Sequence, residues 1–159
     1  KKIEGCPSCF ACIPSGDCPI DDDMQELYSL LKQADGIIFG SPVYFWNVTS
    51  QAKAIMDRTF NLWVTKVLKG KVGGAIACTW TRGTTPALQA INSFFSIQGM
   101  YTGGSFDVTV SGYCQTVAPG TLVTTGLEVD GKTPHNDPWA QARECAREMV
   151  NLINKLKGQ

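Results

Sequence analysis

The sequence has no surplus of charge of either sign, because fourteen acidic residues balance fourteen basic ones among 159 residues. Nothing electrostatic therefore favours nucleic acid or an anionic membrane surface as a partner. No apolar run approaches the roughly 18 residues of a membrane-spanning helix, and no signal-peptide pattern is present. These absences predict one soluble domain, large enough to bury a core, in a reducing cytoplasmic setting.

Cysteine, in contrast, is concentrated near the start of the chain. Cys6, Cys9, Cys12 and Cys18 follow the spacing C-x2-C-x2-C-x5-C. Thiolates this close in sequence can converge on one small volume, and iron–sulfur clusters take their ligands from such compact runs. Zinc usually takes two C-x2-C pairs separated by a longer loop. The spacing therefore favours a 4Fe–4S cluster, with zinc, two disulfides or free thiols as the alternatives.

The other titratable candidates carry less information. Cys78 follows an apolar run and is expected to be a small buried hydrophobe, Cys145 lies on a helical pattern, and Cys114 lies in a loop. An odd total of seven cysteines argues against a secreted disulfide scaffold. The single histidine, His135, is next to an expected helix cap and is assigned no chemistry.

The hydrophobic pattern alternates between helical and strand-like segments. Helices are expected over residues 24–31, 48–68, 86–97 and 138–157, and buried strands over 36–40, 72–78 and 100–110. Asp21–Asp23 and Asn136–Pro138 are expected to cap two of these helices, and Asp130-Gly131 to form a turn. Helical stripes predict that Trp63 and Val150 are buried. This rhythm indicates an open parallel α/β sheet, but three strands alone would leave an apolar edge bare.

Two motifs in the correct order resemble one family. Gly40-Ser41-Pro42-Val43-Tyr44-Phe45 is followed by Val48-Thr49-Ser50-Gln51-Ala52-Lys53 and then by Asp57-Arg58. This arrangement is similar to the NAD(P)H-dependent FMN reductases, and the cysteine run ahead of Asp22-Asp23-Met24 resembles their iron–sulfur flavoprotein branch. The resemblance covers about residues 3–104. It implies a flavodoxin-like, doubly wound parallel sheet in three α/β/α layers, forming a single domain over residues 1–159.

The resemblance implies that FMN binds at the carboxyl end of the strand at 36–40, where open α/β sheets bind ligands. The residues expected to hold its isoalloxazine ring are Ser41, Pro42, Val43, Tyr44 and Phe45. Tyr44 and Phe45 offer flat apolar surface, and the backbone of this loop can hydrogen-bond the edge of the ring. The alternative is that these aromatic residues belong to a core or an interface.

A second loop should border the same crevice. By the resemblance, Thr79, Arg82 and Gly83 contact the flavin or the nicotinamide side. Thr84-Thr85 stands where further glycine is usual in the family, so an exposed loop cation is the alternative for Arg82. Asp57 and Arg58 are expected to form a structural ion pair or an oligomer contact.

The first strand–helix–strand unit of the family, which carries its phosphate-binding loop, has no counterpart in this sequence. Such a unit takes roughly 30 residues or more. Residues 1–6 align with the end of the family's second strand, and the absent first strand would pair with residues 36–40. The favoured interpretation is a partial sequence of a longer polypeptide, and the alternative is a sheet completed by another chain. FMN phosphate-binding residues are therefore not assigned.

Together, the cysteine run and the resemblance predict an electron-transfer oxidoreductase that uses FMN and a 4Fe–4S cluster. The implied electron donor is a one-electron carrier such as ferredoxin, or NAD(P)H, and the implied acceptor is a small molecule such as dioxygen or peroxide. The resemblance also implies a homodimer or homotetramer with the cluster near a subunit interface. The alternatives are an NAD(P)H-dependent FMN or quinone reductase without a cluster, and a flavin-free metal-binding electron carrier or interaction module.

Overall fold

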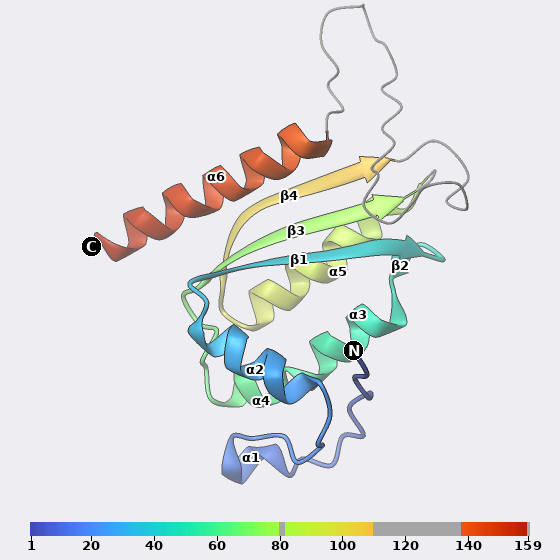
Figure 1. Cartoon of the computed structure of the whole chain (residues 1–159), viewed down its shortest axis with the longest axis vertical. Helices are drawn as coiled ribbons and strands as arrows, with labels where there is room; N and C mark the ends of the chain where they lie inside the picture. Colours follow the sequence, from blue (N-terminus) through green and yellow to red (C-terminus); the bar gives the residue numbers. More distant parts are fainter. Residues whose placement is uncertain (80–81, 110–137, 159) are drawn as a thin grey trace, which may run out of the picture.

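The centre of the molecule is a mostly parallel sheet with the strand order β2-β1-β3-β4 (Figure 1). The computed structural model describes residues 1–79, 82–109 and 138–158. Within them the strands are β1 (Gly36–Tyr44), β2 (Asn47–Val48), β3 (Val72–Thr79) and β4 (Tyr101–Thr109). β1, β3 and β4 run parallel, and β2 pairs antiparallel with the end of β1. The three predicted parallel strands are thus confirmed.

Helices cover both faces of this sheet (Figure 1). They are α1 (Cys12–Ser15), α2 (Met24–Gln33), α3 (Ser50–Arg58), α4 (Phe60–Val64), α5 (Thr84–Ile97) and α6 (Pro138–Lys157). On one face, α2 to α5 enclose the larger core, which includes Met24, Ile91 and Phe95. On the other face, Cys145 and Met149 of α6 pack against Val72. The expected three-layer α/β/α arrangement is confirmed.

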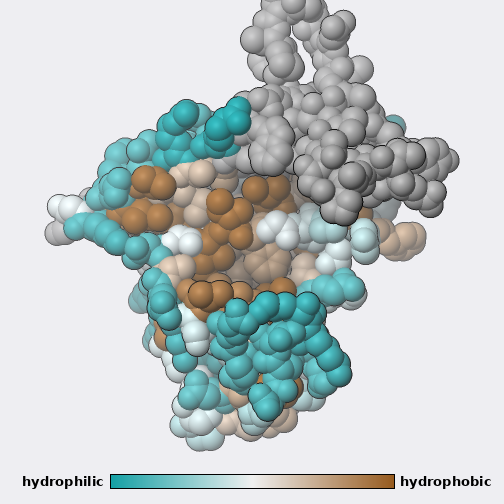
Figure 2. Space-filling view, viewed as in Figure 1, coloured by the Kyte–Doolittle hydropathy of each residue, from teal (hydrophilic) through white to brown (hydrophobic). Residues whose placement is uncertain are grey.

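The outer edge of β1 is largely uncovered by the residues that the structure describes. β2 pairs only with Val43 and Tyr44, so the first two thirds of β1 have no partner on this side within the described ranges. Ile38 is 48% exposed, and an apolar groove of about 220 Å³ runs along this strand beside α2 and α3. Figure 2 shows apolar side chains gathered on this side of the molecule. The predicted bare edge is confirmed here, whereas the expectation that residues 36–40 are buried on both faces is wrong.

The helix expected over residues 48–68 is two helices separated at Thr59. Thr59 has φ −79° and ψ 8°, which ends α3, and α4 begins at the next residue. The side chain of Gln98 donates to the carbonyl oxygen and the hydroxyl of Thr59 at 3.2 and 3.0 Å, which ties this corner to α5. As a result Trp63 is 46% exposed, and its predicted burial is wrong. A break set by a contact 39 residues away leaves no periodic signal in the sequence.

The remaining expectations have mixed outcomes. Cys145 lies on a helix as expected, whereas Cys78 is half-buried and not the fully buried residue that was expected. Val150 is 54% exposed on α6, so its predicted burial is also wrong. The expected turn at Asp130-Gly131, the loop with Cys114 and the cap before Pro138 lie outside the described residues. None of the helices in the described ranges combines the length and apolarity needed to cross a bilayer.

Candidate functional site

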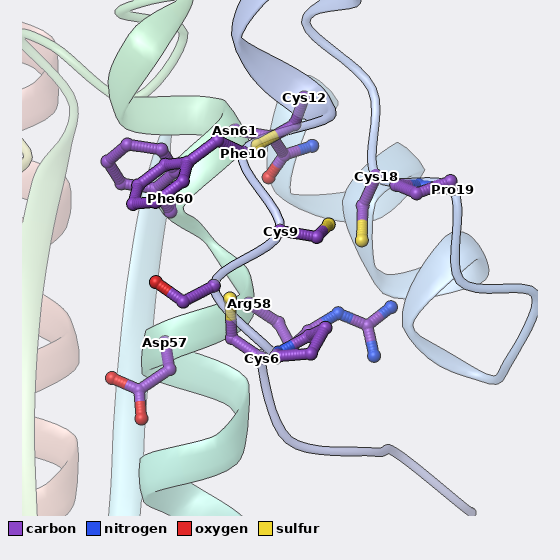
Figure 3. A pocket seen from close by; sticks show the side chains of 12 residues that line it. Cys6, Cys9, Phe10, Cys12, Cys18, Pro19, Asp57, Arg58, Phe60 and Asn61 are labelled. Carbon is purple, nitrogen blue, oxygen red and sulfur yellow. The ribbon is translucent and has the colours of Figure 1, made fainter.

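The segment that carries the four cysteines lies before α2 and turns sharply more than once. Ser8 and Phe10 have φ values of +57° and +58°, and each lies in one of the two C-x2-C spacers. A left-handed conformation is costly for residues with a side chain, at about 1–3 kcal/mol each. Backbone strain of this kind is concentrated at binding and catalytic sites. The two left-handed residues turn the chain so that successive cysteines face a common space (Figure 3).

All four cysteine side chains line one pocket of about 300 Å³ (Figure 3). Cys6, Cys9, Cys12 and Cys18 are free thiols, so the two-disulfide alternative is not adopted in this structure. Burial raises the pKa of the Cys12 thiol, and the neighbouring thiols of Cys18, Cys6 and Cys9 raise it further. The Cys12 thiol is therefore partly shielded from water and has the other three thiols as neighbours, and binding of a metal centre would hold all four as thiolates.

The four thiols line the sides of a cavity and are not gathered around a single position. In the part of the chain that the structure describes, no three Cys, His, Asp or Glu side chains are arranged to hold a single metal ion. A 4Fe–4S cluster is wider than one zinc ion and takes four thiolates around its body. The polar atoms Nδ2 and Oδ1 of Asn61 and Nε of Arg58, which both line the pocket, are buried without a hydrogen-bond partner. The donor set and these unpaired polar atoms fit an iron–sulfur cluster.

Aromatic rings form one wall of the pocket. The rings of Phe10 and Phe60 meet edge to face at a centroid distance of 6.2 Å. Phe60 in turn stacks on Trp63 at 5.6 Å, so the wall continues along α4. Phe10 and Phe60 therefore give the thiols apolar neighbours on one side of the pocket.

Arg58 anchors both ends of the cysteine segment to α3. Its guanidinium forms a bidentate ion pair with Asp22, with Nη1–Oδ2 at 2.7 Å and Nη2–Oδ1 at 3.0 Å. The same group donates to the carbonyl oxygens of Glu4 at 3.0 Å and Ile20 at 3.4 Å, just outside the first and the last cysteine. The side chain of Arg58 is fully buried. The segment is therefore held in place by one buried charge pair.

Two expectations about these charges need correction. Arg58 pairs with Asp22 and not with its neighbour Asp57, which forms an exposed ion pair with Lys53. Of the expected helix-capping aspartates, Asp22 does accept the Met24 amide at 3.0 Å, but the N-cap residue Asp23 makes no side-chain cap bond. The carboxylate of Asp23 accepts the backbone N–H of Lys2 instead. A contact with a residue far away in the chain thus replaces the local helix cap at Asp23.

The Asp22–Arg58 pair predicts a loss of stability in acid. The hydrogen bonds from Arg58, opposed by burial, lower the pKa of Asp22 from 3.8 to about 2. The stabilisation is complete above the unfolded value near 3.8 and is lost as the pH falls through about 2, which amounts to about 2 kcal/mol. We expect urea unfolding between about pH 5 and pH 2 to show this loss in the native chain.

A matched pair of variants tests that assignment. Asp22→Asn should remove this component of the pH dependence, whereas Asp17→Asn should retain it. Asp17 lies within the cysteine segment and pairs with Lys32 at 3.4 Å at the surface. An Asp22→Asn variant with the native acid response would show that another carboxylate is responsible.

The expected flavin loop is a β-hairpin, so its assignment as a loop is wrong. Phe45 and Trp46 form its tip with φ values of +47° and +68°, the signs that a type I′ turn requires. Such turns usually contain Asn-Gly, which is why the aromatic pair gave no hairpin signal. Phe45 is completely exposed, and Tyr44 is also exposed. Exposed aromatic residues at the carboxyl end of a parallel strand, two of them (Phe45 and Trp46) with positive φ, are suited to stacking on a planar ring.

Ser41 supports this hairpin from inside. Its buried hydroxyl accepts the Thr49 amide at 3.1 Å and donates to the carbonyl oxygen of Pro42 at 2.8 Å. The Thr49 hydroxyl then accepts the Ala52 amide at 3.1 Å as the N-cap of α3. The Ser41 side chain is thus engaged within the protein, while Pro42 is exposed and Val43 is half-buried.

The loop after β3 lies against the hairpin. The Thr79 hydroxyl donates to the carbonyl oxygen of Arg82 at 2.7 Å, and Arg82 is itself exposed. Gly83 has φ +97°, and a Cβ there would lie 3.0 Å from Val43 Cγ1 and 3.2 Å from the Cα of Trp46. Glycine is required because the two loops approach so closely. The structure therefore brings the expected flavin residues of β1 and β3 together.

The hairpin and the cysteine segment occupy different parts of the molecule. The tip between β1 and β2 is at the carboxyl edge of the sheet, whereas α1 lies beyond α4 on the helical side (Figure 1). The sequence did not identify Asn61 or Asp22 as part of the cysteine site. The one signal for this arrangement was the Asp57-Arg58 pair in the family motif, whose arginine serves the cysteine segment.

Comparisons with known proteins show which family the chain resembles. A family model described as NADPH-dependent FMN reductase matches residues 3–114. The chain is 43% identical over 111 residues to an iron-sulfur flavoprotein of Methanocaldococcus jannaschii, across 69% of this chain and 58% of that protein. It is 32% identical over 164 residues to an iron-sulfur flavoprotein of Archaeoglobus fulgidus, across 99% of this chain and 80% of that protein.

Solved structures show the same fold. A flavodoxin, WrbA-like protein from Agrobacterium tumefaciens superposes with a TM-score of 0.53 at 18% identity, over 84% of this chain and 73% of that chain. This likeness confirms the flavodoxin-like architecture. The chain spans little more than half of the Methanocaldococcus jannaschii relative, 58% of its length.

Proposed function

The chain belongs to the NADPH-dependent FMN reductase family, and on this premise we propose that it is an iron–sulfur flavoprotein that transfers electrons. In this proposal Cys6, Cys9, Cys12 and Cys18 are the ligands of a 4Fe–4S cluster. FMN lies against the hairpin and the adjoining loop, with its ring beside Tyr44 and Phe45. Electrons pass from a one-electron donor to a small-molecule acceptor.

The observation that carries the proposal is the convergence of four free thiols on one pocket of about 300 Å³. These thiols come from a single short segment whose ends are anchored by a buried charge pair. Left-handed residues in both spacers keep the segment in a turned conformation that nothing in the local sequence favours. The four thiolates would hold a cluster whose binding free energy offsets this strain.

The flavin part rests on the shape of the carboxyl edge of the sheet. Exposed aromatic rings at the hairpin tip offer one planar surface, and the exposed cation of Arg82 lies in the loop that packs against the hairpin. Two hydroxyl groups of the chain hold the backbone that carries these side chains. The Ser41 hydroxyl bonds the backbone of the hairpin, and the Thr79 hydroxyl bonds the backbone of Arg82. When bound, the cluster exchanges single electrons and the flavin exchanges one or two.

The partners follow from this chemistry. A cluster near the surface suits a ferredoxin-like one-electron donor, and the acceptor would be a small molecule that reaches the flavin.

The apolar residues Phe10, Trp63 and Ile97 are exposed, which favours a homodimer or homotetramer. Gel filtration with light scattering of the native protein measures that oligomeric state.

A visible spectrum with metal and flavin analysis tests the proposal. Protein purified without oxygen should show a broad absorption near about 400 nm on top of flavin bands, with about four irons per chain. Iron-free protein with bound flavin would overturn the cluster assignment. Protein with iron but without flavin would instead be a metal-binding electron carrier or interaction module.

A second candidate is an NAD(P)H-dependent FMN or quinone reductase without a cluster. The description of the matching family model favours it. Rapid oxidation of NADPH by an iron-free, flavin-containing preparation, with FMN or a quinone as acceptor, would support this candidate. Under the iron–sulfur proposal, that preparation should be slow with NADPH, and activity should return with the iron.

A further inference from the structure

Two polar side chains in the wall of the cysteine pocket have hydrogen-bonding groups left unused. Asn61 is 1% exposed, and neither its Nδ2 nor its Oδ1 has a partner. The Nε of Arg58, whose side chain is fully buried, is likewise unpaired. Both residues line the same pocket as the four thiols, and in Figure 3 they appear on either side of Cys9. A buried amide or guanidinium N–H without an acceptor is unfavourable, so such groups normally mark a missing partner.

Neither side chain is free to seek that partner elsewhere. The other two nitrogens of the Arg58 guanidinium are engaged by Asp22, Glu4 and Ile20, which fixes the plane of the group. Asn61 lies in the first turn of α4, immediately after the corner that Gln98 ties to Thr59. The unused N–H groups are therefore buried in two residues that line the pocket, and they are held in position before anything binds.

We propose that Asn61 Nδ2 and Arg58 Nε donate hydrogen bonds to the sulfur atoms of the group held by the four cysteines and so raise its reduction potential. The inference rests on the proposed function, because it assumes an iron–sulfur cluster in this pocket. Both residues act as positioning and tuning residues, since they are not ligands of the iron.

The physical reason is the negative charge that reduction adds. A one-electron reductant delivers one electron to the cluster, no bond forms or breaks, and the sulfur atoms become more negative. N–H donors and a nearby cation stabilise the reduced form more than the oxidised form, and hydrogen bonds to the sulfurs are among the known determinants of such potentials. A hydrogen bond to a charged group is also stronger than a neutral one.

Asn61→Leu tests the proposal, because leucine has a similar size and no donor. In an EPR-monitored redox titration of the iron-loaded protein, we expect the ratio of reduced to oxidised cluster at fixed potential to fall about tenfold, which corresponds to about 59 mV for one electron. Asn92→Leu is the matched control. Asn92 is on α5 and exchanges hydrogen bonds with Ser105 at 2.8 and 3.1 Å, away from the pocket. The reduction potential of the cluster in Asn92→Leu should therefore equal that of the native protein.

A purely structural role for Asn61 predicts a different outcome. Removing an unsatisfied buried amide should then leave the free energy of unfolding equal or higher and leave the reduction potential of the cluster unchanged. That result would overturn the proposal.

Arg58→Lys provides a second test, since lysine retains the charge but has no Nε–H in this position. Its potential should shift in the same direction as that of Asn61→Leu, and an unchanged potential would exclude Arg58 as a donor.

The same experiments separate this inference from the proposed function. If the native protein binds no iron, the proposed function fails and the inference fails with it. If the native protein and Asn61→Leu both hold about four irons per chain and have equal potentials, the proposed function stands and only the inference is wrong.

Discussion

Cys9→Ser removes the iron from the protein and leaves flavin bound. Cys9 is the middle cysteine of the compact run, and its side chain lines the thiol pocket between the other ligands (Figure 3). A serine hydroxyl is a far poorer ligand for iron than a thiolate, because it remains protonated near neutral pH. None of the described residues of the hairpin or of the loop after β3 lines this pocket, so flavin binding there should persist. Iron and flavin per chain, with the visible spectrum, measure both effects.

Cys145→Ser is the matched control for that substitution. Cys145 is fully buried on the sheet-facing side of α6, on the opposite face of the sheet from the pocket. Cys145→Ser makes the same exchange of sulfur for oxygen, but in the core. It should therefore lower the free energy of unfolding and leave the iron content unchanged. Unchanged iron content in Cys9→Ser would refute the ligand assignment, and iron loss in both variants would point to misfolding as the cause.

Gly73→Ala has the largest expected effect on folding. Gly73 is in the central strand β3, and a Cβ at this position would lie 2.6 to 2.7 Å from three ring atoms of Phe95. Phe95 is fully buried on α5, so its ring can move aside only by displacing other core atoms. Such overpacking costs roughly 1–3 kcal/mol. Urea unfolding followed by circular dichroism measures the change in the free energy of unfolding.

Two other strand glycines calibrate this result. At Gly74 a Cβ would approach the sulfur of Met149 at 2.5 Å, and a flexible methionine can move, so Gly74→Ala should cost less. At Gly40 the nearest atoms are 4.0 Å away, so Gly40→Ala should be close to neutral. An equal effect at all three positions would mean that glycine acts through the unfolded chain and not through packing.

The layers of the fold and the gathering of four thiols in one pocket could be predicted because their signals are local. Continuous apolar runs at 36–40 and 72–78 indicate strands covered by helices, and four thiols within a short segment have few other places to go. The break at Thr59 could not be predicted, since Gln98 imposes it from another helix. The hairpin was missed because aromatic residues rarely occupy a turn with positive φ.

The sequence by itself determined which chemical groups this protein has: four clustered thiols, an aromatic pair after a buried strand, and alternating helices and strands. Only the tertiary structure decided how they are held. Arg58 joins Asp22, Glu4 and Ile20, and Asn61 faces the thiols, through contacts between segments that are far apart in the chain. Such pairings depend on how helices pack on the sheet. Residue type and spacing do not encode them locally.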